Sequence, residues 1–471
     1  MAGINSILSS DNSKKYLSLK SNGDGWFNYY DLSYFNGYSP MGSTPYQIAL
    51  SGSAGNTVVV GLVEHGFINL PYVSFIVKHD SNGSVLWYRI LSTPASQASE
   101  QITITDVACD TAENIYITGL ISVSDNLPTK NFIMKLTSDG ATSWYSTFYK
   151  DNTIANNSVY VQPPSIAITP NSASPTITVA ATVVNSSGGL DFVLLRYPNA
   201  GGTPTFSRSI TKTGVTTDIG KTADQVVMDT SGNIYALTCY TNNSAVPVAA
   251  VVKYNNTGTF QWSTDYNMST NGTSLFFDGS TTVSVLDSSG SITTYNTSGA
   301  ATSYITGFFD GTFNTQSHTR GMYHSQTSTN LILRSANSIG TTQRKGISLY
   351  GANIPNNTYI SDFDSAAGVV ADSSYYYLAT AGMVCKLPLN GKGYNEDLHF
   401  TYGEAGIGAY KHNVQYLYQK EFTAPRTTAL SGTANNPLTQ STGTITISST
   451  LSAPTNVLAT VPVTGQFYKL Y

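Results

Sequence analysis

Residues 131–149 read NFIMKLTSDGATSWYSTFY, which is an apolar run, a polar turn and a second run that contains Trp144. The pattern recurs, because residues 74–91 read SFIVKHDSNGSVLWYRIL and residues 249–266 read AAVVKYNNTGTFQWSTDY. Alternating β-branched and aromatic residues on both sides of a turn rich in Asp, Asn, Ser and Gly are typical of a tight β-hairpin. The sequence therefore contains several copies of one predicted hairpin.

A second strand pair precedes each hairpin. Residues 104–120 read ITDVACDTAENIYITGL, and residues 223–239 read ADQVVMDTSGNIYALTC. In both segments an apolar strand meets a polar turn and then an alternating strand. The repeated unit is therefore predicted to be four short antiparallel strands.

An aromatic residue in the fourth strand marks the register of each unit. These markers stand 35 to 62 residues apart and indicate seven units: Trp87, Trp144, Phe206, Trp262, Tyr304, Tyr359 and Tyr394. Stacked radially, each four-stranded sheet covers its neighbour, and ring closure protects the edges. The sequence thus predicts an all-β fold, a seven-bladed β-propeller of four-stranded antiparallel blades, with the markers packed in the wedges between blades.

The units resemble the SBBP-type seven-bladed propeller repeat. The motifs that carry the resemblance are DTSGNIY at residues 229–235, the strand at 132–135 and the hairpin at 251–262. The likeness covers residues 46–266 and is poor over 267–402. It implies a propeller fold and says nothing about catalysis, because such propellers serve many roles.

Three regions are expected: an N-terminal aromatic segment at 1–40, the propeller at 41–402, and a β-rich extension at 403–471. Residues 25–38, GWFNYYDLSYFNGY, either pack on the propeller or dock a neighbouring subunit, because Tyr and Trp are enriched at interfaces. The candidate partner-binding residues are Trp26, Phe27, Tyr29, Tyr30, Tyr34 and Phe35. The strand patterns of the extension fit either addition to the ring or pairing with another chain.

Composition limits the class of protein. Of the 471 residues only 11% are charged, against about 25% in typical soluble proteins, and the chain holds 32 Tyr and 40 Gly. Extracellular fibres, virion proteins and binding surfaces share this character. A net charge of −4 without a basic patch argues against nucleic acid as a partner. No apolar stretch is long enough to span a membrane.

The N-terminus, MAGINSILSSDNSKKYL, lacks the basic and apolar regions of a signal peptide. Three widely spaced cysteines, Cys109, Cys239 and Cys385, lie in apolar strand patterns and are expected to be buried free thiols, not a disulfide framework. A virus particle reconciles these features, because its proteins are made in the host cytoplasm, leave by lysis and act outside the cell.

A search for chemistry is mostly negative. The sequence has no motif of a zinc hydrolase, a nucleophile elbow or a phosphate loop. A calcium loop at residues 21–31 would need Lys20 as its first ligand, and GEAGIG at 403–408 has no helix pattern after it, so no metal and no cofactor are expected. The six histidines lack metal-ligand spacing: His65, His79, His318, His324, His399 and His412. Several carboxylates stand in turns, which hairpin chemistry explains: Asp80, Asp139, Asp229 and Asp287.

The function predicted from these features is non-catalytic. The chain is expected to be a structural or adhesive virion component in the tail, baseplate, fibre or capsid surface. Its partners would be other virion proteins, in a homo- or hetero-oligomer, and host-surface glycans. One alternative is an exported cell-surface propeller lectin. The other is a polysaccharide hydrolase or lyase, which would need two carboxylates across a sugar that the sequence does not nominate.

Overall fold

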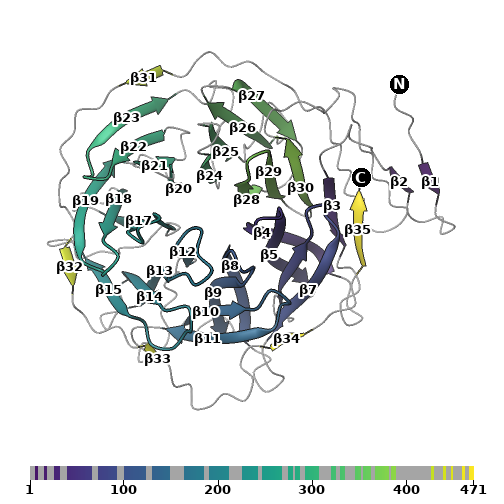
Figure 1. Cartoon of the computed structure of the whole chain (residues 1–471), viewed down its shortest axis with the longest axis horizontal. Helices are drawn as coiled ribbons and strands as arrows, with labels where there is room; N and C mark the ends of the chain where they lie inside the picture. The colour runs from purple at the N-terminus through teal and green to yellow at the C-terminus, as the bar shows by residue number, and fades with distance from the viewer. Residues whose placement is uncertain are drawn as a thin grey trace.

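The structure, a computed structural model, describes strands β1–β35 and most of the short turns within their hairpins. The described turns span residues 52–55, 80–84, 110–114, 137–141, 169–176, 198–205, 229–233, 255–259, 297–300 and 372–374. All described elements are strands, and their sheets lie around a ring (Figure 1). No helix that could cross a membrane occurs in this part of the chain.

The first four sheets follow one another along the chain. In each of them four consecutive strands form an antiparallel meander, and we call these meanders blades one to four. Blade one is β4 (Pro40–Ser51), β5 (Asn56–His65), β6 (Val73–His79) and β7 (Val85–Ser92). Blade two is β8 (Glu100–Cys109), β9 (Ile115–Val123), β10 (Lys130–Leu136) and β11 (Thr142–Phe148). Blade three is β12 (Ser165–Ile168), β13 (Ile177–Val184), β14 (Leu190–Tyr197) and β15 (Phe206–Thr211). Blade four is β16 (Gln225–Met228), β17 (Ile234–Thr241), β18 (Pro247–Tyr254) and β19 (Phe260–Asn267).

Three further sheets complete the described ring. Blade five is β20 (Ser274–Phe277), β21 (Thr282–Leu286), β22 (Ile292–Asn296) and β23 (Ala301–Thr306). Blade six is β24 (Arg320–His324), β25 (Thr329–Arg334), β26 (Lys345–Gly351) and β27 (Ile354–Ser361). Blade seven is β28 (Ala366–Ala371), β29 (Tyr375–Thr380), β30 (Met383–Pro388) and, from the other end of the chain, β3 (Trp26–Asp31). The predicted all-β propeller of four-stranded antiparallel blades is therefore confirmed.

Blade seven joins the two ends of the ring. Strand β3 pairs with β30, so that Trp26 lies opposite Lys386 and Tyr29 opposite Met383. The sequence placed residues 1–40 outside the array and expected the last marker at Tyr394, which lies outside the described residues. The structure instead places β3 inside a blade, and the ring closes by pairing strands more than 350 residues apart.

Strands from the C-terminal extension add to the outer edges of blades. β31 (Arg426–Thr428) pairs with β23, β32 (Thr439–Ser441) with β15, and β33 (Ile447–Ser448) with β11. β34 (Ala459–Val461) then pairs with β7, and β35 (Gln466–Leu470) with β3. Figure 1 shows these yellow strands outside the ring. An added strand covers edge groups that would otherwise be unpaired. A separate hairpin of β1 (Ser6–Leu8) and β2 (Lys15–Leu17) lies apart from the ring.

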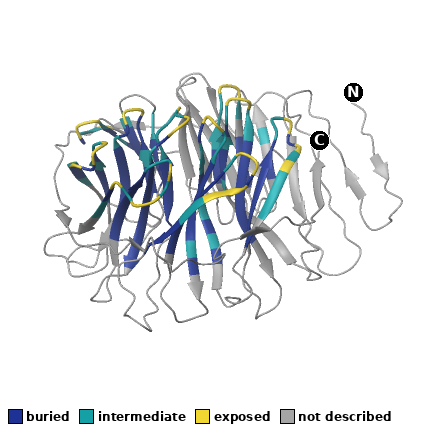
Figure 2. Cartoon of the chain, turned by 60° about the horizontal axis from the view of Figure 1, so that its bottom comes forward, coloured by how far each residue is buried: buried dark blue, intermediate teal, exposed yellow. Residues whose placement is uncertain are grey.

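The core lies between blades. Each of the five clusters of buried apolar side chains takes its members from two neighbouring blades. One cluster joins Phe192 and Leu194 of blade three to Ile234 and Val252 of blade four, all of them fully buried. A fully buried side chain of this size contributes about 1.5–3 kcal/mol. The blades that these clusters join are therefore stabilised by the neighbours that cover them, as Figure 2 shows for the dark blue strands.

The markers keep one register in four blades. Trp87, Trp144, Phe206 and Trp262 each lie opposite a cation of the third strand, namely Lys78, Lys135, Arg196 and Lys253. Trp26 opposite Lys386 repeats this pair in blade seven. In blade five the equivalent position, next to the strand bulge, is Ser303, and Tyr304 is one residue further on. Tyr359 lies in β27, but its side chain is outside the described set.

The aromatic markers pack against glycines of the next blade. The hairpin turn between the third and fourth strands has a glycine with positive φ, and a Cβ there would touch the marker of the preceding blade. At Gly201 such an atom would lie 2.5 Å from Trp144, and at Gly258 it would lie 2.7 Å from Phe206. Only a residue without a side chain fits both the backbone and the ring.

We predict that Gly201→Ala destabilises the fold more than Gly202→Ala. Both glycines have positive φ, 77° and 88°, so alanine costs about 1–2 kcal/mol of backbone strain at either site. Only at Gly201 would the new Cβ meet Trp144, whereas nothing lies within 4 Å at Gly202. Urea unfolding should show an extra loss of about 1–3 kcal/mol for Gly201→Ala. Equal losses would contradict the aromatic packing.

Candidate functional site

One end of the ring is built from described turns. The turns between first and second strands and those between third and fourth strands lie at the same end of antiparallel blades. We call this end the turn face, and Figure 2 shows its exposed turns in yellow. Nearly all the polar contacts described below lie on it.

In blades one, two and four a cation and a tryptophan reach the next blade. Lys78 Nζ and Trp87 Nε1 both donate to the Ser138 carbonyl oxygen, at 3.0 and 2.9 Å. Lys253 Nζ and Trp262 Nε1 share the Thr297 carbonyl at 3.0 and 2.8 Å. We call this arrangement the interblade clamp and the boundary it crosses a seam. Its acceptor is the second residue of the next third-to-fourth turn.

The clamp recurs with small variations at three more seams. Trp144 Nε1 donates to the Asn199 carbonyl at 3.0 Å, while Lys135 Nζ donates to the Asn199 side-chain oxygen at 2.7 Å. Arg196 reaches the Asn256 carbonyl at 2.5 Å. Lys386 reaches the Ser81 carbonyl at 3.2 Å and thereby ties blade seven to blade one.

Aspartates hold the turns between first and second strands. Asp110 accepts hydrogen bonds from the backbone N–H groups of Ala112 and Asn114 at 2.9 and 2.8 Å, and from the Asn114 side chain at 2.8 Å. The Tyr116 hydroxyl donates to the same carboxylate at 2.8 Å. Burial, reinforced by this aspartate, raises the pKa of Tyr116. The repeated Asp and Tyr of the sequence motif are thus structural partners.

The turn carboxylates predicted from sequence are placed as expected where they are described. Asp80 accepts from the N–H groups of Asn82 and Ser84, at 2.9 and 2.7 Å. Asp139 accepts from the Thr137 hydroxyl and the Ala141 N–H group, which lower the pKa of its carboxyl group. Asp287 lies outside the described residues. Hairpin chemistry therefore explains these acids.

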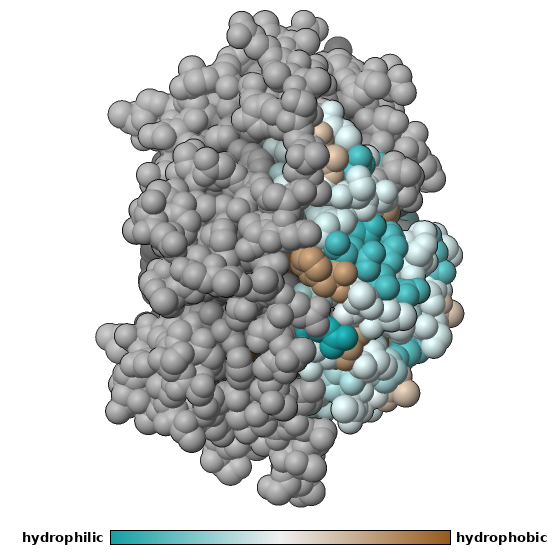
Figure 3. All heavy atoms as spheres, turned by 90° about the vertical axis from the view of Figure 1, so that its left-hand side faces the viewer, coloured by the Kyte–Doolittle hydropathy of each residue, from teal (hydrophilic) through white to brown (hydrophobic). Residues whose placement is uncertain are grey.

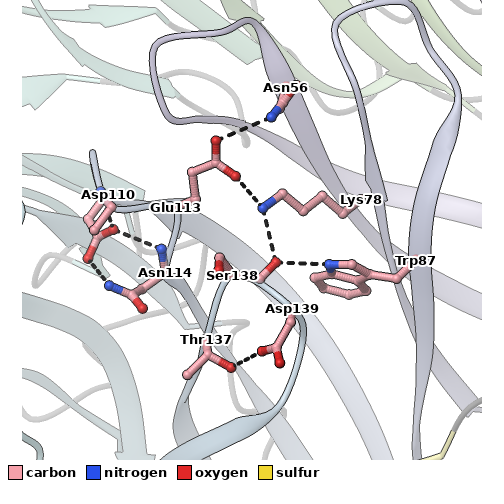
Figure 4. Close-up of polar contacts among 10 residues, drawn as sticks. Asn56, Lys78, Trp87, Asp110, Glu113, Asn114, Thr137, Ser138 and Asp139 are labelled. Atoms are coloured by element: carbon pink, nitrogen blue, oxygen red, sulfur yellow. Dashed lines mark hydrogen bonds and ion pairs between the residues drawn. The ribbon is translucent and has the colours of Figure 1, made fainter.

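The seam between blades one and two carries an ion pair. Glu113 Oε2 lies 2.5 Å from Lys78 Nζ, and its Oε1 accepts from the Asn56 amide at 3.2 Å, as drawn in Figure 4. Lys78 is only 2% exposed. Glu113 has φ of 63°, which is costly for a residue with a side chain. This strain is tolerated because the carboxylate neutralises a buried cation.

The seam between blades three and four carries a depression of about 440 Å³. The buried Arg196 guanidinium lines it together with hydroxyl and amide side chains, among them Ser172, Ser174, Thr230, Ser231, Asn256 and Thr257. The sequence did not single out this place. The sequence feature that could have pointed to this depression is Gly232, because the equivalent position in the turn of blade two is Glu113.

Cys109 and His79 have pKa values that burial shifts. Burial raises the pKa of the Cys109 thiol to about 12, which leaves it protonated and unreactive at neutral pH. Cys109 is a free cysteine, as predicted, but the residue is half-buried and not fully buried as expected. The side chains of Cys239 and Cys385 are outside the described set. Burial lowers the pKa of His79 to about 3, against the opposing charge of Asp80.

Within the described part of the chain, no group of three or more His, Cys, Asp or Glu side chains could hold a metal ion. The predicted docking residues Trp26, Phe27, Tyr29 and Tyr30 lie in β3, between β30 and β35. Tyr34 and Phe35 lie outside the described residues. The docking role of this segment stays a prediction.

The described surface is largely neutral and polar. Figure 3 shows the side of the ring near β19, where apolar residues form only small separate groups. Leu86, 52% exposed, is the large hydrophobic side chain that the described surface leaves open to water. Broad apolar patches mark obligate interfaces, and here the described surface offers hydroxyl and amide groups instead.

No protein-family model matches this chain, and no curated protein sequence is similar to it. Its fold is similar to BamB of Moraxella catarrhalis, with 11% identity, TM-score 0.40, and coverage of 75% of this chain and 87% of that one. The fold is also similar to the WD40 domain of Neurospora crassa Pan2, with 9% identity, TM-score 0.43, and coverage of 73% of this chain and 88% of that one. For a Trypanosoma rangeli sialidase the identity is 8% and the TM-score 0.37, and the match covers 81% of this chain and 60% of that one. With TM-scores below 0.5, the propeller assignment rests on the strand pairing.

We predict that Glu113→Gln destabilises the protein by about 1–3 kcal/mol. Glutamine keeps the size and a hydrogen bond, but it leaves the buried Lys78 cation without a counter-ion. Chemical denaturation of both proteins at low ionic strength measures the difference. A matched control is Glu113→Gln combined with Lys78→Met, in which no unpaired charge remains and part of the stability should return. A fully silent single variant would contradict the pairing.

We predict that His79→Leu makes stability less sensitive to acid. The folded pKa of about 3 lies below the ordinary value of 6.5, so the unfolded chain takes up the proton first. The free energy of unfolding should therefore fall as the pH drops from 6.5 towards 3, by up to about 1.4 kcal/mol per pH unit from this residue.

Leucine is a fitting replacement, because Leu136 holds the same register position in blade two. Urea unfolding between pH 7 and pH 4 should give a shallower pH slope for the variant. Identical slopes would mean that His79 is not held neutral by burial.

Proposed function

We propose that this protein is a non-catalytic binding platform, whose turn face contacts partners through shape and neutral polar groups. The observation that carries the proposal is the use made of the charged side chains. The described cations on the turn face bond to the next blade, and the described aspartates hold turns. Groups committed to structure in this way are poorly available for acid–base chemistry.

Rigidity supports the same proposal. Each clamp joins two blades through a carbonyl that accepts from side chains of the preceding blade. A surface that is already ordered loses little entropy when it binds. The turns between the clamps present hydroxyl, amide and backbone groups, which suit hydrogen bonding to proteins and to sugars.

The place we propose for this platform is a virus particle, as a tail, baseplate, fibre-linked or capsid-surface component. Support for this setting comes from composition, because 11% charged residues and 32 Tyr are typical of particle and adhesive proteins. Its partners would be other proteins of the particle and host-surface glycans. The strand β3 and the aromatic segment after it would contribute to these contacts.

The test is the protein content of purified virus particles from the source culture, by quantitative mass spectrometry. We expect a fixed copy number relative to the major capsid protein. Absence from the particles, with the protein in the cell envelope or medium, would overturn the particle setting. Release of reducing sugar from host polysaccharide that is lost on changing one carboxylate would overturn the non-catalytic function.

A further inference from the structure

Two seams share one turn geometry but differ in the residue that faces the cation of the preceding blade. The turns at Asp110 and Asp229 have the same hydrogen bonds, because each aspartate accepts from the backbone N–H groups two and four residues on. Each also accepts from an asparagine side chain at 2.8 Å. At the fourth position of the turn, blade two has Glu113 and blade four has Gly232. The two seams are therefore internal controls for one another.

In the first seam the clamp cation has a counter-ion. Lys78 comes from blade one, and Glu113 extends from the turn of blade two to meet it at 2.5 Å. The carboxylate takes this position although Glu113 must adopt a φ of 63°. The equivalent Gly232 has a similar φ of 78°. The backbone is thus prepared for the same side-chain direction in both seams.

In the second seam the cation is buried without an acid. Arg196 is 6% exposed, and its bonds go to neutral oxygens of Thr176, Gly232 and Asn256 at 2.5, 3.1 and 2.5 Å. Among the described residues no carboxylate pairs with it. Burial lowers the pKa of Arg196, yet a guanidinium stays charged at any physiological pH. Buried charges in proteins are normally paired.

In the second seam no side chain takes the position of Glu113, because the equivalent residue is Gly232. A Cβ on Gly232 would lie 3.0 Å from Arg196 Nη2, so a carboxylate entering there would meet the guanidinium. Gly232 and Arg196 both line the 440 Å³ depression, which is in the size range of small-molecule sites. The three bonds above engage three of the five N–H donors of the guanidinium.

The other residues that line the depression indicate which kind of carboxylate ligand fits it. Ser172, Ser174, Thr230, Ser231 and Thr257 contribute hydroxyl groups from both blades. Hydroxyl groups that can donate and accept suit a ligand that is itself rich in hydroxyl groups. An apolar carboxylate would leave these groups unsatisfied, at a cost in affinity.

We propose that the seam between blades three and four binds the carboxylate of an acidic sugar, a uronic acid unit. The carboxylate takes the position that Glu113 holds in the first seam, beside Arg196, and the sugar hydroxyls bond to the Ser and Thr side chains. The inference rests on the proposed function only in treating the turn face as a surface that binds without catalysis.

The test is a ligand-observed NMR titration of the full chain with methyl glucuronide, with methyl glucoside and acetate as the two half-ligands. We expect binding of the glucuronide and at least tenfold weaker binding of either half-ligand. In Gly232→Glu the new side chain should pair with Arg196, as Glu113 does with Lys78, and affinity should fall about tenfold or more.

Glu113 shows that glutamate can adopt this backbone conformation, but a Cβ at Gly232 would lie 3.0 Å from Arg196 Nη2, so urea unfolding must first show that Gly232→Glu is folded. The matched control is Lys253→Gln, which removes a clamp cation from the next seam and should leave the affinity unchanged. No glucuronide binding by the unaltered protein, or equal affinity in Gly232→Glu, would overturn the site. Either result leaves the particle measurement untouched, so the two proposals fail separately.

Discussion

The described structure depends on one contact that recurs, with small variations, at five seams of the ring. A backbone carbonyl, on the second residue of a hairpin turn, accepts hydrogen bonds from a cation and a tryptophan of the preceding blade. The turn must then pass close to the aromatic ring, which requires glycine two residues later. The lysine, tryptophan and glycine of the repeated hairpin therefore all serve the interblade clamp. It ties neighbouring blades together at the turn face, while the apolar clusters fill the space between them.

Much of this could be read from the sequence, because the residues of the interblade clamp are local in each unit. The spacing of Lys135, Gly140 and Trp144 is visible in one hairpin, and its copies predict the blade. The expected packing of the markers between blades also followed, since Trp87, Trp144, Phe206 and Trp262 share one register. Blade five departed from it because its hairpin has Ser303 at the marker position, and the nearby Tyr304 was a misleading substitute.

Contacts between distant segments could not be predicted in this way. The pairing of β3 with β30 leaves no trace in either strand alone, since any edge strand of suitable pattern could fill that place. The same holds for the strands of the extension, β31 to β35. The candidate site could be predicted from the sequence only in part. Glu113 and Gly232 are aligned in the sequence motif, but only the fold shows that a cation of the preceding blade faces each of them.

The function we propose follows from the contacts that the charged side chains of the ring make. Few are present, and on the described turn face the cations bond to the next blade while the aspartates hold their own turns, which leaves a surface of hydroxyl and amide groups. The exception is the seam where glycine replaces glutamate and the buried cation meets an open depression. Variation at a single turn position would therefore convert a structural seam into a binding seam. In repeat proteins such changes are cheap, because the remaining units preserve the fold.

The central claim is that each clamp holds the next blade, and hydrogen exchange tests it most directly. The measurement compares the unaltered protein with a variant carrying Lys135→Met and Trp144→Phe, peptide by peptide, by mass spectrometry. Both donors of this clamp act on Asn199. We expect faster exchange in the turn at 198–205 of blade three, with the variant's own hairpin at 137–141 little changed. Unchanged exchange at 198–205, or an equal increase around the whole ring, would contradict the claim.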